Sequence, residues 1–157
     1  MEHAMTVECG DLSLLDDPIA TELLDSTLPA RLAYAWTDGT PRVVPIWFHW
    51  DGSAVLMGTP VKAPKVEALR AHPTVAISID SSTFPYRFLS LRGQAQLSLL
   101  DDVSPAYAAA AERYFGPEGG RAWVAQLSGQ PMVEIRVVPS WVNIIDFESR
   151  LPSALSS

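Results

Sequence analysis

Three β-prone runs follow one another near the start of the chain, the first with apolar side chains at every second position, and each run predicts a β-strand. The runs cover residues 31–37, 42–50 and 54–59. The pairs Asp38-Gly39 and Asp51-Gly52 separate them, and Asp-Gly between β-prone runs is typical of a hairpin turn. We therefore expect a three-stranded antiparallel meander. Pro45 should mark a bulge or an unpaired edge position in it, because proline donates no ladder hydrogen bond.

Helical spacing replaces this alternation in four other places. Helices are expected from Pro18 to before Leu28, at 64–71, from Pro105 to about Tyr114, and from Pro117 to about Leu127. Proline suits the first turn of a helix, and each of these segments has one there. Further strands are expected at 75–80, 87–100, 130–138 and 140–147. Gly93 inside the long strand indicates a bulge or a close backbone approach, and Pro139 separates the last two strands.

The order of elements predicts a mainly β protein with short helices, of the α+β class. Mostly adjacent antiparallel strands favour a closed or half-closed barrel of six to seven strands. A chain of 157 residues is the length of one domain. We assign residues 16–150 to that domain, residues 1–15 to a mobile N-terminal segment and residues 151–157 to a C-terminal tail.

Composition excludes several classes of protein. The single cysteine, Cys9, cannot form an internal disulfide, and without a Cys/His cluster no metal site is expected. The net charge of −7 argues against nucleic-acid binding. No apolar run is long enough to cross a membrane, and the first ten residues do not resemble a signal peptide. We therefore expect a cytoplasmic protein.

The positive charges point to an anion site. Lys62 and Lys65 are the only lysines, and they lie three residues apart, between a strand that ends near Thr59 and the helix that begins at Pro64. Free amides at a helix N-terminus attract anions. A hydroxyl and two ammonium groups beside them would complete a cradle for a phosphate group. No phosphate-binding P-loop pattern is present.

The stretch "RVVPIWFHWDG…VLMGTPVKAPKVEALRAHPTVAISID", followed by "LSLRGQAQL", resembles the pyridoxamine 5′-phosphate oxidase-like FMN-binding split-barrel family. "PSWVNIIDF" near the end is similar to the last strand of these proteins. The resemblance spans about residues 30–100 and implies a split β-barrel. It also implies a homodimer with FMN in a groove between the subunits.

The resemblance implies roles for particular residues. The strand with Val44, Pro45, Ile46 and Trp47 would run beside the flavin ring, with Trp47 near the ring itself. Thr59, Lys62, Lys65 and the basic residue Arg42 would hold the phosphate at the end of the ribityl chain. No catalytic side chain is assigned, because a flavin supplies the reactive group itself.

We expect an oxidoreductase that uses FMN to transfer hydride to or from a small substrate. The C-terminal segment of true pyridoxamine-phosphate oxidases is not recognisable in "SRLPSALSS". A neighbouring branch of the fold binds the deazaflavin coenzyme F-420, and a deazaflavin-dependent reductase is therefore an alternative. Two further alternatives are a non-catalytic flavin-binding protein and a dimeric barrel whose groove takes another ligand.

Overall fold

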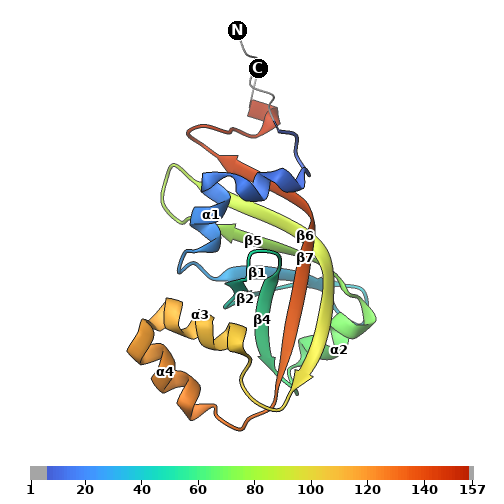
Figure 1. Cartoon of the computed structure of the whole chain (residues 1–157). Coiled ribbons are helices and arrows are strands. Elements are labelled where there is room, and N and C mark those ends of the chain that lie inside the picture. Colours follow the sequence, from blue (N-terminus) through green and yellow to red (C-terminus); the bar gives the residue numbers. More distant parts are fainter. Residues whose placement is uncertain (1–6, 156–157) are drawn as a thin grey trace.

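The computed structural model describes residues 7–155 as seven strands and four α-helices, with a short 3₁₀ helix near each end (Figure 1). In chain order, the elements are η1 (Leu12–Asp16), α1 (Pro18–Leu24), β1 (Ala30–Ala35), β2 (Pro41–Ile46), β3 (His49–Trp50), β4 (Val55–Pro60), α2 (Pro64–Ala71), β5 (Thr74–Asp80), β6 (Arg87–Leu100), α3 (Pro105–Phe115), α4 (Pro117–Gln126), β7 (Met132–Asp146) and η2 (Ser153–Leu155).

The seven strands form one antiparallel sheet in the order β2-β1-β5-β6-β7-β4-β3. The sheet curves around an apolar core without closing, because β2 and β3 remain at its two ends (Figure 1). Burying a large aliphatic side chain contributes roughly 1.5–3 kcal/mol. The fully buried side chains of this core include Leu32, Met57, Ile77, Leu91, Ile135 and Ile144. The structure confirms the predicted α+β fold with an antiparallel split barrel.

The expected three-stranded meander is wrong in its middle strand. Residues 42–50 do not form one strand, because the chain changes partner at Trp47 and Phe48. Before that point β2 pairs with β1, and after it β3 pairs with β4. The Phe48 side chain is fully buried, so the chain bends toward the core between β2 and β3. Pro45 lies on an edge strand as predicted, since β2 has a ladder on one side alone.

The two strands expected after residue 130 are one continuous strand, β7, which pairs with β6 along its whole length. Pro139 does not end the strand because the register shifts there, so that Arg92 pairs with Trp141 and Gly93 with Pro139. A β-carbon on Gly93 would lie 2.6 Å from the carbonyl oxygen of Val138. Both readings of Gly93, the bulge and the close backbone approach, are therefore confirmed.

Helix α3 is fixed to the barrel by polar contacts as well as by packing. The Ser104 hydroxyl caps its first turn by accepting from the Tyr107 amide. Near its end, the Arg113 guanidinium donates to the carbonyl oxygens of Ser26 and Phe48. The Tyr114 hydroxyl donates to the carbonyl oxygen of Leu28 at 2.8 Å. These bonds fix α3 beside the point where the chain leaves β2.

Gly120 in α4 supports a sharp stability prediction, because α3 and α4 pack closely at this position. A β-carbon there would lie 2.4 Å from the amide nitrogen of Glu112 and 2.5 Å from its Cα. These are backbone atoms and cannot rotate away, so we expect Gly120→Ala to lower the free energy of unfolding by about 2 kcal/mol or more. Chemical denaturation followed by circular dichroism measures it.

The neighbouring glycine is the matched control. A β-carbon on Gly119 would meet only the Phe115 β-carbon, at 3.3 Å. Because alanine favours a helix interior over glycine by up to about 1 kcal/mol, Gly119→Ala should leave the stability unchanged or raise it. Equal losses in the two variants would contradict the close helix contact.

Of the N-terminal segment predicted to be mobile, residues 1–6 lie outside the described part. Residues 7–15 contact β7, where the Gly10 amide donates to the Val142 carbonyl at 2.7 Å and Leu14 is buried. The predicted C-terminal tail begins with η2, and residues 156–157 are again outside the described part. No helix within residues 7–155 combines the length and apolarity that a membrane crossing requires.

Candidate cofactor-binding site

The eight residues predicted to bind the cofactor lie on two diverging stretches of chain. The β3–β4 ladder pairs His49 with Leu56 and Trp50 with Val55, and it stops there. Continuing the same register would set Thr59 opposite Ile46 and Lys62 opposite Val43. Because that ladder is not made, the free edges of β2 and of the second half of β4 keep unpaired backbone groups. The two predicted stretches thus extend from the two sides of one hairpin and diverge beyond it.

Strand β2 presents its predicted residues on two different faces. Val44 and Ile46 pair with Leu32 and Ala30 and pack against the core. Pro45 lies on the outer face, together with Val43, which is 64 % exposed. A flat ligand beside β2 can therefore reach the free edge and the outer face of the strand. The side chains of Val44 and Ile46 pack against the core and are not available to it.

Arg42 lies at the start of β2 and is exposed. Its guanidinium stacks over the Trp36 ring, with 4.9 Å between Cζ and the ring centroid. The guanidinium forms no ion pair or hydrogen bond within residues 7–155, and the carboxyl that feels its charge is Asp38, whose pKa is lowered by hydrogen bonds to Thr40 and also by Arg42. A cation–π contact leaves the N–H groups of the guanidinium free to donate to an anion.

Thr59 is the clearest sign of a missing partner. The residue is 1 % exposed, and its Oγ1 is the one buried side-chain nitrogen or oxygen within residues 7–155 that has no hydrogen-bond partner. Leaving a buried hydroxyl unpaired costs about 1–3 kcal/mol. The hydroxyl is closed to solvent, so a ligand can reach it only if the covering side chains shift. A phosphoryl oxygen would supply the hydrogen bond that Thr59 lacks.

The two lysines lie where the sequence predicts, Lys62 in the connection between β4 and α2 and Lys65 at the start of α2. Lys62 is exposed and Lys65 is half-buried in the first turn of α2. Burial lowers the pKa of the Lys65 ammonium below its ordinary value. Neither ammonium group forms an ion pair within residues 7–155. We call residues 59–65, with Thr59, Lys62 and Lys65, the lysine corner.

Most other cations of the described chain have a partner, which sets the lysine corner apart. Four arginines form ion pairs with carboxylates, and two donate to backbone carbonyl oxygens. The ion pairs are Arg31–Asp80, Arg87–Glu22, Arg121–Glu112 and Arg136–Asp51, and the carbonyl-bound residues are Arg113 and Arg150. The cations left without an ion pair or a carbonyl acceptor within residues 7–155 are the two lysines of the lysine corner, Arg70 on α2, and Arg42 and Arg92, each of which stacks on a tryptophan ring.

The N-terminus of α2 is open to an anion. Its N-cap, Ala63, has no side chain that could accept a hydrogen bond, and Pro64 occupies the first helical position. The amides of the first turn therefore lack a side-chain cap, and the helix dipole adds positive potential at the same place. Together with Lys62, Lys65 and Thr59, this helix end has the donor set that a phosphate group requires.

Trp47, which the family resemblance places near the flavin ring, lies directly after β2. In the structure it packs into a cluster of aromatic side chains. Its indole stacks on Tyr114, with 5.0 Å between centroids and 12° between planes, and meets the Phe115 ring edge-on at 4.9 Å. Tyr107 lies 5.8 Å away. We call Trp47, Tyr107, Tyr114, Phe115 and Trp123 the aromatic cluster. The sequence pattern carries no signal that the aromatic residues of α3 surround Trp47.

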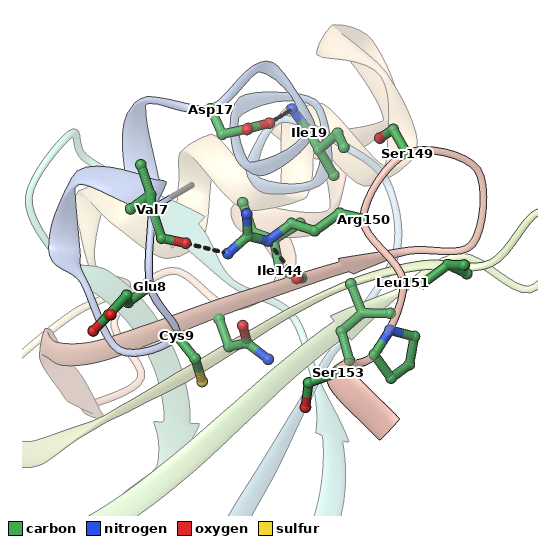
Figure 2. Close-up of a pocket in the computed structure, with 13 residues that line it drawn as sticks. Val7, Glu8, Cys9, Asp17, Ile19, Ile144, Ser149, Arg150, Leu151 and Ser153 are labelled. Carbon is green, nitrogen blue, oxygen red and sulfur yellow. Dashed lines mark hydrogen bonds between the residues drawn. The ribbon is translucent and has the colours of Figure 1, made fainter. Parts of the chain in front are cut away.

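Two pockets on the surface of the described residues are large enough to consider as ligand sites. One, of about 320 Å³, lies on the outer face of the sheet and has Val43 and Trp141 on its rim. The larger, of about 940 Å³, lies where the two ends of the described chain meet, and Figure 2 shows Arg150 inside it, donating to the carbonyl oxygens of Val7 and Ile144. None of the eight predicted residues lines the larger pocket. The larger pocket is therefore not part of the predicted site, in spite of its size.

Comparison with known proteins identifies the fold and a family. The family model described as pyridoxamine 5′-phosphate oxidase matches residues 17–145. No curated protein matches the chain significantly.

Several solved structures are similar to this one. An "F420 Reductase" is 32% identical, covers 77% of this chain and 93% of its own, and has a TM-score of 0.61. A putative pyridoxamine 5′-phosphate oxidase from Listeria innocua is 23% identical, covers 83% and 98%, and has a TM-score of 0.62. An FAD-binding protein from Mesorhizobium loti is 22% identical, covers 85% and 92%, and has a TM-score of 0.55. The last two support the fold alone.

Proposed function

Because the chain belongs to the pyridoxamine 5′-phosphate oxidase-like family, we propose that it holds a flavin-type cofactor by its phosphate and acts as an oxidoreductase on a small substrate. The observation that carries this proposal is the unpaired, buried hydroxyl of Thr59 beside two lysines without ion-pair partners. A buried hydroxyl without a partner costs free energy until a ligand completes its hydrogen bond, and the two unpaired ammonium groups in the same stretch of chain supply positive charge for an anion.

Each residue of the predicted site has a role in this proposal. The Lys62 and Lys65 ammonium groups and the backbone amide of Lys65 hold the phosphate oxygens, and Thr59 donates to one of them. The Val66 amide already donates to the Ala63 carbonyl oxygen. Arg42 adds a further cation from the start of β2. The free edge of β2, from Val44 to Trp47, lies along the ring and supplies backbone donors and acceptors. When bound, the cofactor supplies the hydride chemistry, while the protein orients it and shapes the pocket.

FMN and the deazaflavin coenzyme both carry a phosphate that this site can hold. FMN is the cofactor predicted from the sequence. The similarity to the F420 reductase, at 32% identity over most of both chains, favours the deazaflavin. Arg70, at the end of α2, is a further cation without a recorded partner and could meet an additional anionic group such as a carboxylate tail. We therefore propose a deazaflavin-dependent reductase as the first activity to test and an FMN-dependent one as the second.

We also propose a homodimer in which the outer face of the sheet meets a second copy. Val43 is 64 % exposed there, and the indole of Trp141 stands half-buried under the Arg92 guanidinium, 3.8 Å from Cζ to the ring centroid. The hollow between them has a floor of small residues, among them Ala33, Ala76 and Ser90. The molar mass in solution, measured by light scattering, tests this assembly.

Cofactor affinity should depend on pH through Lys65. Burial lowers the pKa of this ammonium in the protein without ligand, and a bound phosphate raises it again. Affinity therefore holds while Lys65 is protonated and falls as the pH rises through the lowered pKa. Lys65→Arg should abolish the fall, because a guanidinium stays charged throughout.

Dissociation constants measured by fluorescence between pH 7 and pH 10.5 check this prediction. Lys62→Arg is the control and should keep the fall of the parent protein. A pH profile that is the same in the parent and in Lys65→Arg would show that Lys65 does not face the phosphate.

The proposed activity is tested on the full chain purified without added cofactor. Titration with FMN and with coenzyme F-420, followed by flavin fluorescence, establishes which one binds. The oxidation of reduced coenzyme by a conjugated acceptor is then followed by absorbance. We expect saturable binding of at least one cofactor and protein-dependent turnover. Binding without turnover would favour a non-catalytic flavin-binding protein, and binding of neither would reject the proposal.

A further inference from the structure

The pocket of about 320 Å³ on the outer face of the sheet arises from the sizes of cross-strand neighbours, and we call it the outer pocket. One row of opposed residues crosses five strands from β2 to β7, in the order Val43, Ala33, Ala76, Arg92 and Trp141. Directly opposed residues lie side by side on one face of a sheet. Because the two alanines are small, the row is low in its middle, and the outer pocket lies there.

The neighbouring row supplies hydroxyl groups to the same pocket. Arg31 is opposed to Ser78, and Ser78 is opposed to Ser90. Both serines are half-buried, and neither hydroxyl forms a hydrogen bond within residues 7–155. A hydroxyl without a protein partner is free to donate to an acceptor on a ligand. The floor of the outer pocket therefore offers two hydrogen-bond donors.

The outer pocket carries positive charge and no negative charge. Of the described residues, Arg31 and Arg92 are the charged ones that line it, and no aspartate or glutamate does. Arg31 shares its charge with Asp80 at 3.3 Å. The Arg92 guanidinium forms neither an ion pair nor a hydrogen bond in the part of the chain that the structure describes. On a chain of net charge −7, a pocket that contains cations alone favours an anion.

Trp141 holds the Arg92 guanidinium in place. The guanidinium stacks over the indole, with 3.8 Å between Cζ and the ring centroid. A stacked guanidinium keeps its N–H groups in its own plane, where they can bind both oxygens of a carboxylate. The indole is itself held by the N-terminal segment, because a β-carbon on Gly10 would lie 2.8 Å from Trp141 Cδ1. The cation is therefore oriented before an anion arrives.

We infer that the outer pocket binds a small organic carboxylate. The two carboxylate oxygens accept from Arg92 and from the Ser90 hydroxyl. The carbon body of the ligand lies over Ala33 and Ala76, against the exposed side chain of Val43. A bare inorganic anion would satisfy the guanidinium and leave this apolar surface uncovered. None of the eight residues of the predicted cofactor site lines the outer pocket, so this ligand is distinct from the cofactor.

The carboxylate also bears on the homodimer of the proposed function, and this step rests on that proposal. A twofold dimer uses the same surface patch on both subunits. Two outer pockets would then enter one interface with two guanidinium groups from each copy and no carboxylate among their lining residues. Burying a cation without a counter-charge is costly. A carboxylate in each outer pocket removes that cost, so the ligand and the dimer stabilise each other.

Benzoate is the probe, because it joins a carboxylate to a flat apolar ring. Arg92 stacks on Trp141, so binding should change the tryptophan emission of the cofactor-free protein saturably. Arg92→Gln should raise the dissociation constant at least about tenfold, because a charge-assisted pair is lost. Benzamide, which has the same shape without the charge, should bind the parent at least about tenfold more weakly than benzoate does, and should bind Arg92→Gln like the parent.

An arginine outside the outer pocket provides the matched control. Arg70 on α2 also lacks a partner within the described residues, and Arg70→Gln removes the same single charge. Its benzoate affinity should stay within about twofold of the parent value, because an exposed charge at a distance is screened by salt. Arg92 is exposed, so the melting temperature of Arg92→Gln should stay near that of the parent. Equal benzoate affinity in the parent and in Arg92→Gln would overturn the inference.

Light scattering separates this inference from the proposed function. At equal ionic strength, the parent should dimerise more tightly in sodium benzoate than in sodium chloride, and Arg92→Gln should dimerise equally in both. A dimer that is as tight in chloride, and that Arg92→Gln weakens, would show that a carboxylate of the second copy fills the outer pocket, against the inference. A monomer in both salts would reject the proposed homodimer, while the benzoate titration still decides the site. The protein with Lys62→Met and Lys65→Met should bind benzoate like the parent, so failure of the lysine corner leaves this result unchanged.

Discussion

Replacing Lys62 and Lys65 together by methionine is expected to weaken cofactor binding at least about 100-fold. Charge-assisted hydrogen bonds contribute about 1.5–3 kcal/mol each, and two of them correspond to two or more factors of ten in affinity. Methionine keeps an unbranched apolar chain, so the half-buried stem of Lys65 is still filled. Titration followed by flavin fluorescence measures the loss, with FMN and coenzyme F-420 as the two ligands.

A matched pair of charges elsewhere provides the control for this variant. Arg87 and Arg121 are surface cations on β6 and α4, and each is paired with a carboxylate. Replacing both by methionine lowers the net charge by the same two units and should change the affinity by less than about threefold, because exposed ion pairs and distant charges contribute little. Equal losses in the two double variants would indicate a general electrostatic effect, with no specific role for the lysine corner.

Thr59→Val is expected to shift stability and binding in opposite directions. Valine has nearly the same shape, and at this position, opposite Val133 in the β4–β7 ladder, it would remove the one buried hydroxyl that has no partner. The free energy of unfolding of the protein without cofactor should rise by about 1 kcal/mol, because an unpaired buried hydroxyl is no longer retained. Cofactor affinity should fall about tenfold, because the phosphate loses a donor.

Thermal unfolding and binding titrations on the same samples test this prediction. For a chain of this size, about 1 kcal/mol corresponds to a rise of roughly 2–4 °C in Tm. Thr74→Val is the control: its hydroxyl already accepts from Gln94 at 2.9 Å on the exposed start of β5. That variant should be no more stable than the parent and should bind cofactor normally. A stabilised Thr59→Val protein with unchanged affinity would remove Thr59 from the site.

Local signals in the sequence were sufficient for most of the fold. The bounds of α2 and β6 agree with the predicted ranges, because proline starts, a proline stop and strict alternation act over a few residues. The split between β2 and β3 could not be read in this way. Residues 42–50 are one β-prone run with no turn signal inside it, and only the pairing of its first part with β1 and of its last part with β4 divides the run at Phe48.

The candidate site was predictable in its chemistry and only partly in its geometry. The concentration of both lysines between a strand and a helix is visible in the sequence, whereas the missing partner of Thr59 and the unpaired state of Arg42 appear only in the fold. The aromatic cluster was out of reach, because Trp47 and Phe115 are 68 positions apart and no local pattern joins them. Long-range contacts of this kind follow from strand order and carry no periodic signal.

The measurement that tests the central claim most directly compares each cofactor with its form lacking the phosphate. Riboflavin has the ring and ribityl chain of FMN without the phosphate, and the corresponding fragment of coenzyme F-420 keeps the deazaflavin ring and its ribityl chain. For the cofactor that binds, the phosphorylated form should bind at least about 100-fold more tightly than its counterpart, and the difference should vanish in the Lys62→Met, Lys65→Met protein. Equal affinity for the two forms in the parent protein would show that the lysine corner does not hold a phosphate.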